Sequence, residues 1–245
     1  MTSLLPHLFT TLNLFSGFYS IIATFEGKYF HGALAILMAI VFDIFDGRLA
    51  RLTGQSSKFG KEFDSLADMV SFGVAPALLI YNYSLKAFTK MGWVASFIYT
   101  ACVALRLARF NVKPSSGIHF EGLPSPAGGA IIASTILLLI HLGIDPLYKS
   151  WLTIVMVYLL SYFFISPIKY PAFKEIKIKK IQSFYFLVLF ILVLSITATN
   201  PPLILFLLTT LYVTLGPLIL LKKWGCRFYR KCLKKEKNPK KLTND

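Results

Sequence analysis

The chain has 245 residues, of which 56% are hydrophobic and 15% are charged, and its formal net charge is +15. An ordinary soluble domain carries about 25% charged residues, so this composition excludes a typical soluble protein. In a membrane protein an excess of Lys and Arg is typical of cytoplasmic loops, so the positive charge does not indicate a nucleic-acid partner.

Apolar stretches of about 20 residues, the length that crosses a bilayer core, recur along the chain. They predict an all-α integral membrane protein with about eight transmembrane helices, at 8–25, 30–52, 63–85, 91–110, 125–144, 147–166, 183–199 and 202–221. We expect one transmembrane domain over residues 1–221, followed by a basic tail over residues 222–245.

The distribution of basic residues predicts the orientation of these spans. With eight spans both termini lie on the same side of the membrane, and most of the Lys and Arg residues fall on that side. The positive-inside rule therefore places both termini in the cytoplasm, most simply at a bacterial inner membrane. The basic tail either binds anionic lipid headgroups or serves only to fix this orientation.

An acidic pattern lies between the second and third predicted spans. It reads Asp43-x-x-Asp46-Gly47-x-x-Ala50-Arg51, eight further residues, then Gly60-x-x-x-Asp64-x-x-x-Asp68. An aspartate near the centre of a membrane helix costs about 2.5–3.5 kcal/mol on insertion scales. Four aspartates at helical spacing therefore indicate that something cationic lies between them.

The spacing predicts that the four carboxylates converge. Residues advance about 100° each around a helix, so Asp43, Gly47 and Ala50 share a face on which small side chains allow a bulky ligand close to the backbone. Asp64 and Asp68 lie one turn apart on the next helix. A short polar connection joins the two helices, which predicts antiparallel neighbours with the acids near the cytoplasmic boundary.

Oxygen ligands without nearby His or Cys select hard divalent cations such as Mg²⁺, Mn²⁺ or Ca²⁺. Four carboxylates suit two ions about 3.5–4 Å apart, an arrangement that serves phosphoryl chemistry. Two alternatives stay open at this point. The acids could form buried salt bridges with Arg48, Arg51 or Lys61, or they could form an ion-transport site.

The acidic run resembles the signature of the CDP-alcohol phosphatidyltransferases, D-x-x-D-G-x-x-A-R-x8-G-x-x-x-D-x-x-x-D, at every fixed position. Further stretches, at 5–13, 105–111 and 120–129, are similar to one branch of that family, the membrane-integral (type II) phosphatidylserine synthases. His7 stands where we expect Asn in that branch. The resemblance covers most of residues 5–130.

The resemblance implies an enzyme that transfers the phosphatidyl group from CDP-diacylglycerol to an alcohol, L-serine in this branch, and releases CMP. It implies two divalent ions, one held by Asp43, Asp46 and Asp64 and the other by Asp43, Asp64 and Asp68. It also implies that Asp68 accepts the proton of the attacking hydroxyl, and that the enzyme is a homodimer. Other acceptors within the family are glycerol 3-phosphate, inositol phosphate and choline.

Candidate substrate contacts come partly from the resemblance and partly from the residue pattern. For CDP-diacylglycerol the resemblance implies Gly47, Arg51 and Ser57, and the small Ala50 leaves room for the cytidine. Thr10 and Asn13, a near-turn apart on the first span, contact either the nucleotide or a polar group on a neighbouring helix. For L-serine the candidates are Arg106, Arg109 and Asn111 at the cytoplasmic end of the fourth span, because an arginine fork matches a carboxylate. Arginines at a helix end also serve as topology anchors, and the same pair would suit a phosphate-bearing acceptor.

Overall fold

The protein is described from a computed structural model that covers residues 4–52, 57–112, 119–148, 150–171 and 200–217. The side chains of 4–6, 50–52, 119–121 and 169–171 lie outside this description. The principal helices are α1 (Leu4–Phe25), α2 (Tyr29–Leu52), α3 (Lys58–Asp68), α4 (Ala75–Tyr83), α5 (Lys90–Val112), α6 (Ser125–His141) and α7 (Trp151–Ile165). A C-terminal helix spans Pro201–Pro217.

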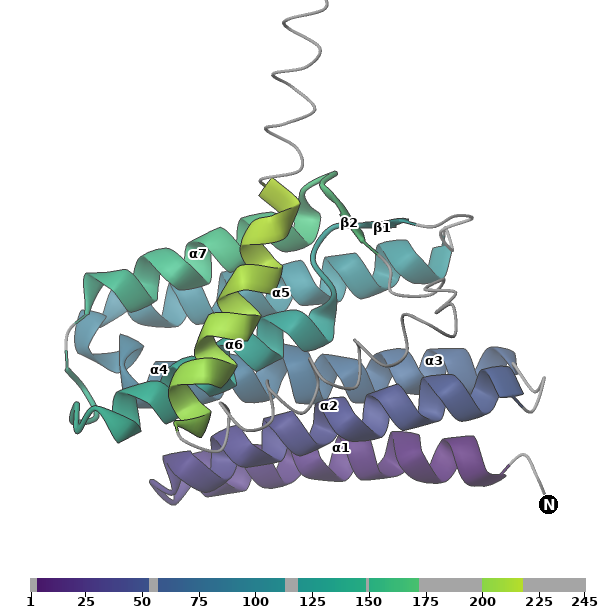
Figure 1. Cartoon of the computed structure of the whole chain (residues 1–245), viewed down its shortest axis with the longest axis horizontal. Coiled ribbons are helices and arrows are strands. Elements are labelled where there is room, and N and C mark those ends of the chain that lie inside the picture. Colours follow the sequence, from purple (N-terminus) through teal and green to yellow (C-terminus); the bar gives the residue numbers. More distant parts are fainter. Residues whose placement is uncertain (1–3, 53–56, 113–118, 149, 172–199, 218–245) are drawn as a thin grey trace, which may run out of the picture.

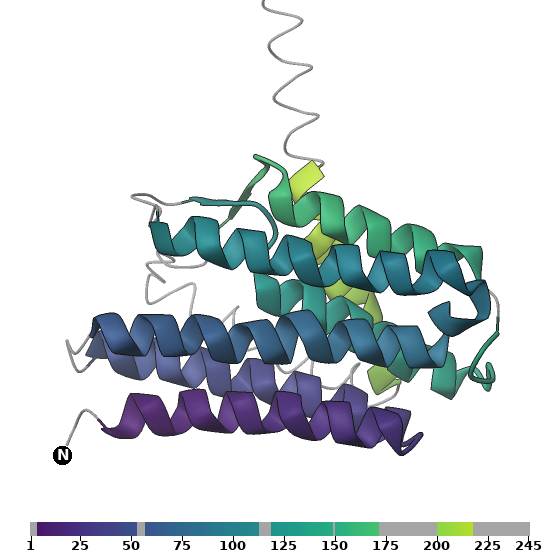
Figure 2. The ribbon, with the colours of Figure 1, turned by 180° about the vertical axis from the view of Figure 1, so that it is seen from behind.

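Helices α1 to α7 lie roughly parallel to one another, with successive long segments running in opposite directions, whereas the C-terminal helix crosses them obliquely (Figures 1 and 2). The start of α1, the end of α2, the start of α3 and the end of α5 therefore all lie at one end of the bundle (Figure 1). We call this the N-terminal end. The acidic motif and the predicted arginines belong to these segments, so the fold brings them to the same end.

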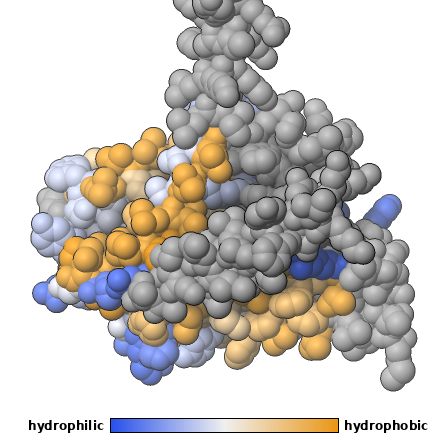
Figure 3. Space-filling view, viewed as in Figure 1, coloured by the Kyte–Doolittle hydropathy of each residue, from blue (hydrophilic) through white to orange (hydrophobic). Residues whose placement is uncertain are grey.

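Four helices are long and apolar enough to cross a membrane: His7–Phe25, Tyr29–Leu49, Lys58–Tyr83 and Lys90–Val112. They confirm the first four predicted spans. The third begins before residue 63 because Ser57 caps α3, its side chain accepting a hydrogen bond from the Gly60 backbone N–H at 2.9 Å. The apolar surface in Figure 3 suits contact with lipid tails.

The prediction of eight spans is not confirmed. The fifth and sixth predicted spans correspond to α6 and α7, which are shorter apolar helices, as is the C-terminal helix. Both predicted spans ran too far because the apolar segment between them contains a turn, with positive φ at Gly143 (68°) and Leu147 (70°). The predicted span 183–199 and the predicted tail lie outside the described residues.

The long third helix is interrupted directly after Asp68 by a π-helical turn, η1 (Met69–Val74). A π turn leaves backbone carbonyls free for other donors. Here the Tyr99 hydroxyl donates to the Phe72 carbonyl oxygen at 3.0 Å. Helix α1 approaches the same turn closely at Gly17, where an added Cβ would lie 2.3 Å from Ser71 Oγ. These contacts fix the turn that follows Asp68.

A small ribbon is the exception to the all-α expectation. Strands β1 (His119–Glu121) and β2 (Lys169–Pro171) pair antiparallel, with Phe120 opposite Tyr170. The Gly122 backbone N–H donates to the Ile168 carbonyl oxygen at 2.9 Å, and Gly122 has a positive φ of 84°. A Cβ on Gly122 would lie 2.4 Å from the Phe164 carbonyl oxygen, so this approach requires glycine. The ribbon thereby places the start of α6.

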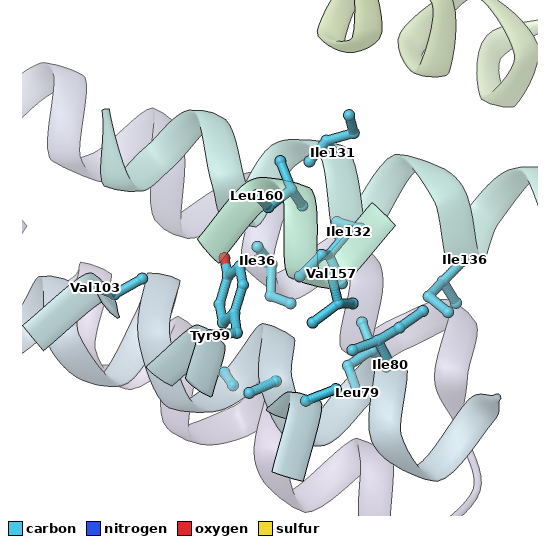
Figure 4. Close-up of a cluster of buried hydrophobic side chains, with 14 of the residues drawn as sticks. Ile36, Leu79, Ile80, Tyr99, Val103, Ile131, Ile132, Ile136, Val157 and Leu160 are labelled. Carbon is cyan, nitrogen blue, oxygen red and sulfur yellow. The ribbon is translucent and has the colours of Figure 1, made fainter. Parts of the chain in front are cut away.

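The apolar core lies beyond the acidic end and joins helices that are distant in the sequence. Figure 4 shows buried side chains from α2, α4, α5, α6 and α7 in one cluster, among them Ile36, Leu79, Tyr99, Ile132 and Val157. Each of these five side chains is fully buried. This packing holds α2, α5 and α6 in fixed positions, and those helices supply polar residues to the site.

Candidate active site

Three carboxylates from two helices converge at the N-terminal end of the bundle. Asp43 on α2 and Asp64 and Asp68 on α3 each offer an oxygen, and these oxygens all lie within 4.8 Å of one another. Asp43 and Asp64 are partly exposed, whereas Asp68 is only 8% exposed. The predicted convergence of the two helices is therefore seen for three of the four acids.

Asp46 lies beside this group but outside the set of three. It is 5% exposed, interacts electrostatically with Asp64, and forms hydrogen bonds with the Thr10 hydroxyl and the Gly47 backbone. Its Oδ2 is buried and has no hydrogen-bond partner among the described residues. Oδ1 of Asp64 is likewise buried without a hydrogen-bond partner among the described residues. Buried carboxylate oxygens without partners are costly unless a cation is close.

These observations test whether the residues fit a divalent metal centre. The converging ligands are all carboxylate oxygens, the set that Mg²⁺, Mn²⁺ and Ca²⁺ prefer. Close carboxylates repel one another in a poorly solvated site. A cation among them would cancel this repulsion and would also give the partnerless oxygens an interaction. Lys61, one of the alternative ion-pair partners, donates instead to the Asn111 carbonyl oxygen at 3.2 Å. The residues fit the metal.

Asp68 is held differently from Asp46 and Asp64 because both of its oxygens accept hydrogen bonds. Asn13 Nδ2 on α1 donates to Asp68 Oδ1 at 3.2 Å, and Ser125 Oγ at the start of α6 donates to Asp68 Oδ2 at 3.3 Å. Arg106 Nη1 on α5 donates in turn to Ser125 Oγ at 3.0 Å. Ser125 lies in the 120–129 stretch but is not among the site residues predicted from the sequence.

The residues predicted to contact CDP-diacylglycerol fall into different surroundings. Gly47 is exposed, and among the described residues no atom of another element lies within 4 Å of the position that its Cβ would occupy, so these residues leave the α2 face open there. Thr10 and Asn13 are buried and contact Asp46 and Asp68, respectively. The cluster thus includes two polar side chains from α1.

The remaining donor candidates lie near the end of α2 and the start of α3. Ser57 is exposed, and its hydroxyl caps α3. Ala50 and Arg51 belong to the last turn of α2, and their side chains lie outside the described part of the structure.

The three candidate serine contacts also lie in different surroundings. Arg106 is half-buried, its Nε has no partner among the described residues, and it interacts electrostatically with Asp68 and Asp43. Arg109 is exposed. Asn111 joins α5 to α3, because its Nδ2 donates to Glu62 Oε2 at 3.0 Å and contacts Ser65 Oγ at 3.0 Å. Arg106 therefore interacts with two of the three converging acids.

The fold and site define a membrane-embedded protein with an acidic cluster, suited to divalent cations, at one end of a helical bundle. The sequence model of the CDP-alcohol phosphatidyltransferase family matches residues 3–161, which include α1 to α6 and most of α7. The chain belongs to the CDP-alcohol phosphatidyltransferase family.

Curated relatives are similar to most of this chain. A CDP-diacylglycerol–serine O-phosphatidyltransferase from Helicobacter pylori is 36% identical over 181 residues, which cover 71% of this chain and 74% of the relative. A protein of the same name from Methanocaldococcus jannaschii is 37% identical over 165 residues, covering 67% and 72%. An archaetidylserine synthase from Methanothermobacter thermautotrophicus is 41% identical over 132 residues, covering 53% and 56%.

Proposed function

We propose that the protein transfers the phosphatidyl group from CDP-diacylglycerol to L-serine, forming phosphatidylserine and CMP. The observation that carries this proposal is the convergence of Asp43, Asp64 and Asp68 within a chain that matches the family along most of its length. The names of the relatives, which specify serine as the acceptor, support the choice of alcohol.

Two divalent ions, Mg²⁺ or Mn²⁺ with Ca²⁺ as a further option, would be held by the four acids. Asp43, Asp46 and Asp64 would hold one ion, and Asp43, Asp64 and Asp68 the other. The partnerless oxygens of Asp46 and Asp64 support this assignment. Bound ions would neutralise the diphosphate of the donor and the charge that develops on the leaving CMP.

In the reaction the serine hydroxyl oxygen forms a bond to the phosphorus that carries the diacylglycerol. The bond from that phosphorus to the oxygen of CMP breaks, and CMP leaves with the electron pair. Asp68 takes the hydroxyl proton. A buried carboxylate with a defined orientation suits this task, because a general base must lie within hydrogen-bonding reach of the proton that it removes.

The donor would lie along the open face of α2. Gly47 and Ala50 leave room for the cytidine, Arg51 supplies charge-assisted hydrogen bonds to phosphate, and Ser57 is a further contact near the start of α3. Thr10 and Asn13 contribute through the aspartates that they contact. Direct contact of these two residues with the nucleotide stays a prediction.

Arg106 is our choice for the group that receives the serine carboxylate. Its guanidinium lies near Asp68, and its Nε is buried without a partner among the described residues, so it can donate to an arriving anion. Placing the carboxylate there would bring the hydroxyl of the same small molecule toward Asp68. Arg109 and Asn111 stay candidates for the wall of the same pocket.

The membrane arrangement that we propose keeps eight spans within a domain over 1–221. Both termini, the basic tail over 222–245 and the acidic site face the cytoplasm of a bacterial inner membrane. The excess of Lys and Arg on the predicted cytoplasmic side supports this orientation, and the four long helices support the membrane location. By analogy with the family, the enzyme is a homodimer whose surface is covered by membrane lipids.

A direct assay tests the proposed function. Purified protein with CDP-diacylglycerol, Mg²⁺ or Mn²⁺ and labelled serine should release CMP and form labelled phosphatidylserine. Glycerol 3-phosphate, inositol phosphate and choline are tested in parallel. Turnover with one of these, and none with serine, would replace the acceptor. Metal uptake into proteoliposomes without any CDP-alcohol would support an ion-transport site instead.

Replacing Arg106 tests its place in the acceptor pocket. We expect Arg106→Ala to raise the KM for serine by about 10-fold or more, because a charge-assisted bond of about 1.5–3 kcal/mol is lost, with a smaller change in the KM for CDP-diacylglycerol. Arg106→Lys keeps the charge but not the fork and should fall between the two. A larger effect on the KM for CDP-diacylglycerol would place Arg106 on the donor. A larger effect of Arg109→Ala on serine would move the carboxylate there.

A further inference from the structure

The orientation of Asp68 depends on two residues to which neither the family signature nor the proposed substrate contacts give this role. Asn13 and Ser125 come from α1 and α6, and each donates to a different oxygen of the carboxylate, at 3.2 and 3.3 Å. Asn13 is fully buried and Ser125 is 1% exposed. Two donors on opposite oxygens prevent the carboxylate from rotating about its Cβ–Cγ bond.

Each of these donors is itself held in place. Ser71 Oγ in the π turn donates to the Asn13 backbone carbonyl at 2.9 Å, which fixes α1 at this level. Arg106 Nη1 donates to Ser125 Oγ at 3.0 Å. Because the Ser125 oxygen accepts from a guanidinium, its own hydrogen is directed to Asp68 and becomes a stronger donor. The network therefore reaches Asp68 from α1 and α6, with α5 behind Ser125.

Asp46 and Asp64 lack a comparable arrangement among the described residues. Oδ2 of Asp46 and Oδ1 of Asp64 have no partner within the part of the chain that is described, as expected of oxygens that bind a cation. An ionised carboxylate has about four acceptor sites, so two bonds on Asp68 leave about two sites with a fixed direction. One suits a metal ion and the other suits the hydroxyl proton of the acceptor.

We propose that Asn13 and Ser125 are positioning residues, which hold the Asp68 carboxylate in the orientation that receives the acceptor proton. This inference rests on the role of Asp68 in the proposed function. A misplacement of about 1 Å can cost about 100-fold in rate, so loss of either donor lowers turnover more than it lowers binding.

The test is Ser125→Ala in the full chain, with Ser134→Ala as the matched control. Ser134 is also a buried serine of α6, but its hydroxyl bonds to the Ile131 carbonyl and Thr209 Oγ1, away from the acids. We expect Ser125→Ala to lower kcat by about 10- to 100-fold relative to the control. The KM for CDP-diacylglycerol and the Mn²⁺ affinity, measured by electron paramagnetic resonance, should change by less than about twofold.

Two further readouts separate positioning from a loss of folding. The solvent deuterium isotope effect on kcat should rise in Ser125→Ala, because proton removal becomes slower, and Ser125→Thr should recover most of the rate. Asn13→Ala perturbs the same carboxylate through its other oxygen and should give the same pattern if Ser125→Ala is unstable in thermal unfolding.

The proposal is overturned if Ser125→Ala matches Ser134→Ala in kcat, or if its loss of kcat is accompanied by an equal loss of Mn²⁺ affinity. Failure of the underlying role is distinguishable. Full turnover by Asp68→Asn would remove Asp68 as the proton acceptor, whereas an inactive Asp68→Asn beside a fully active Ser125→Ala would remove only the positioning.

Discussion

Asp68→Asn should abolish turnover while leaving some binding of the nucleotide donor. The substitution keeps the size of the side chain but removes its basic oxygen, and a positioned general base contributes about 10²- to 10⁴-fold to rate. Asp43, Asp46 and Asp64 would still offer carboxylates to one of the two proposed ions. We therefore expect kcat to fall by at least about 100-fold, with CDP-diacylglycerol binding retained in a metal-dependent titration.

Asp145→Asn is the matched control, because Asp145 is exposed in the turn between α6 and α7, at the other end of the bundle. It undergoes the same chemical change without touching the acidic cluster and should keep wild-type kinetics. A near-wild-type rate for Asp68→Asn would mean that another group or a water molecule removes the proton.

The convergence of the acids could be predicted from the sequence because it depends on local geometry. Asp64 and Asp68 are four residues apart on one helix. A short connection joins this helix to the preceding one, which carries Asp43. The structure brings these three acids within 4.8 Å. The four long spans were also predictable, because apolar length alone reveals them.

The surroundings of Asp68 could not be predicted because they depend on tertiary packing. Asn13 and Ser125 lie 55 and 57 residues away from Asp68 along the chain, and no periodic pattern connects them to it. The π turn after Asp68 has no sequence signal that we recognised. The end of α6 and the start of α7 were missed because apolar turn residues such as Leu147 were counted as part of a span.

Asn13 shows where an interpretation from the sequence stops. The sequence singles it out as a polar residue within an apolar span and leaves two partners open, the nucleotide or a polar group on a neighbouring helix. In the structure its amide donates to Asp68. A buried polar side chain in a membrane helix needs a partner, but the sequence does not identify that partner, since ligand and neighbouring helix satisfy the same hydrogen-bonding need.

Asp43→Ala should have a broader effect than Asp68→Asn. Asp43 is the only acid of the converging three that comes from α2, and in the proposed assignment it contacts both ions. Without it, the proposed ions would be held only by Asp64 and Asp68 of α3 and by Asp46, which lies outside the converging set. We expect Mn²⁺ affinity to fall by at least about 10-fold, or about 1.4 kcal/mol, and donor binding and turnover to fall with it.

The two aspartate variants together distinguish the roles of the two helices. Mn²⁺ titration followed by electron paramagnetic resonance, and donor binding with and without metal, should show a loss in Asp43→Ala that excess Mn²⁺ partly restores. Excess Mn²⁺ should not restore turnover in Asp68→Asn, because that variant lacks a proton acceptor and not only a ligand. If excess metal rescued both variants equally, Asp68 would act only as a metal ligand, as Asp43 does, and its additional role as the proton acceptor would be wrong.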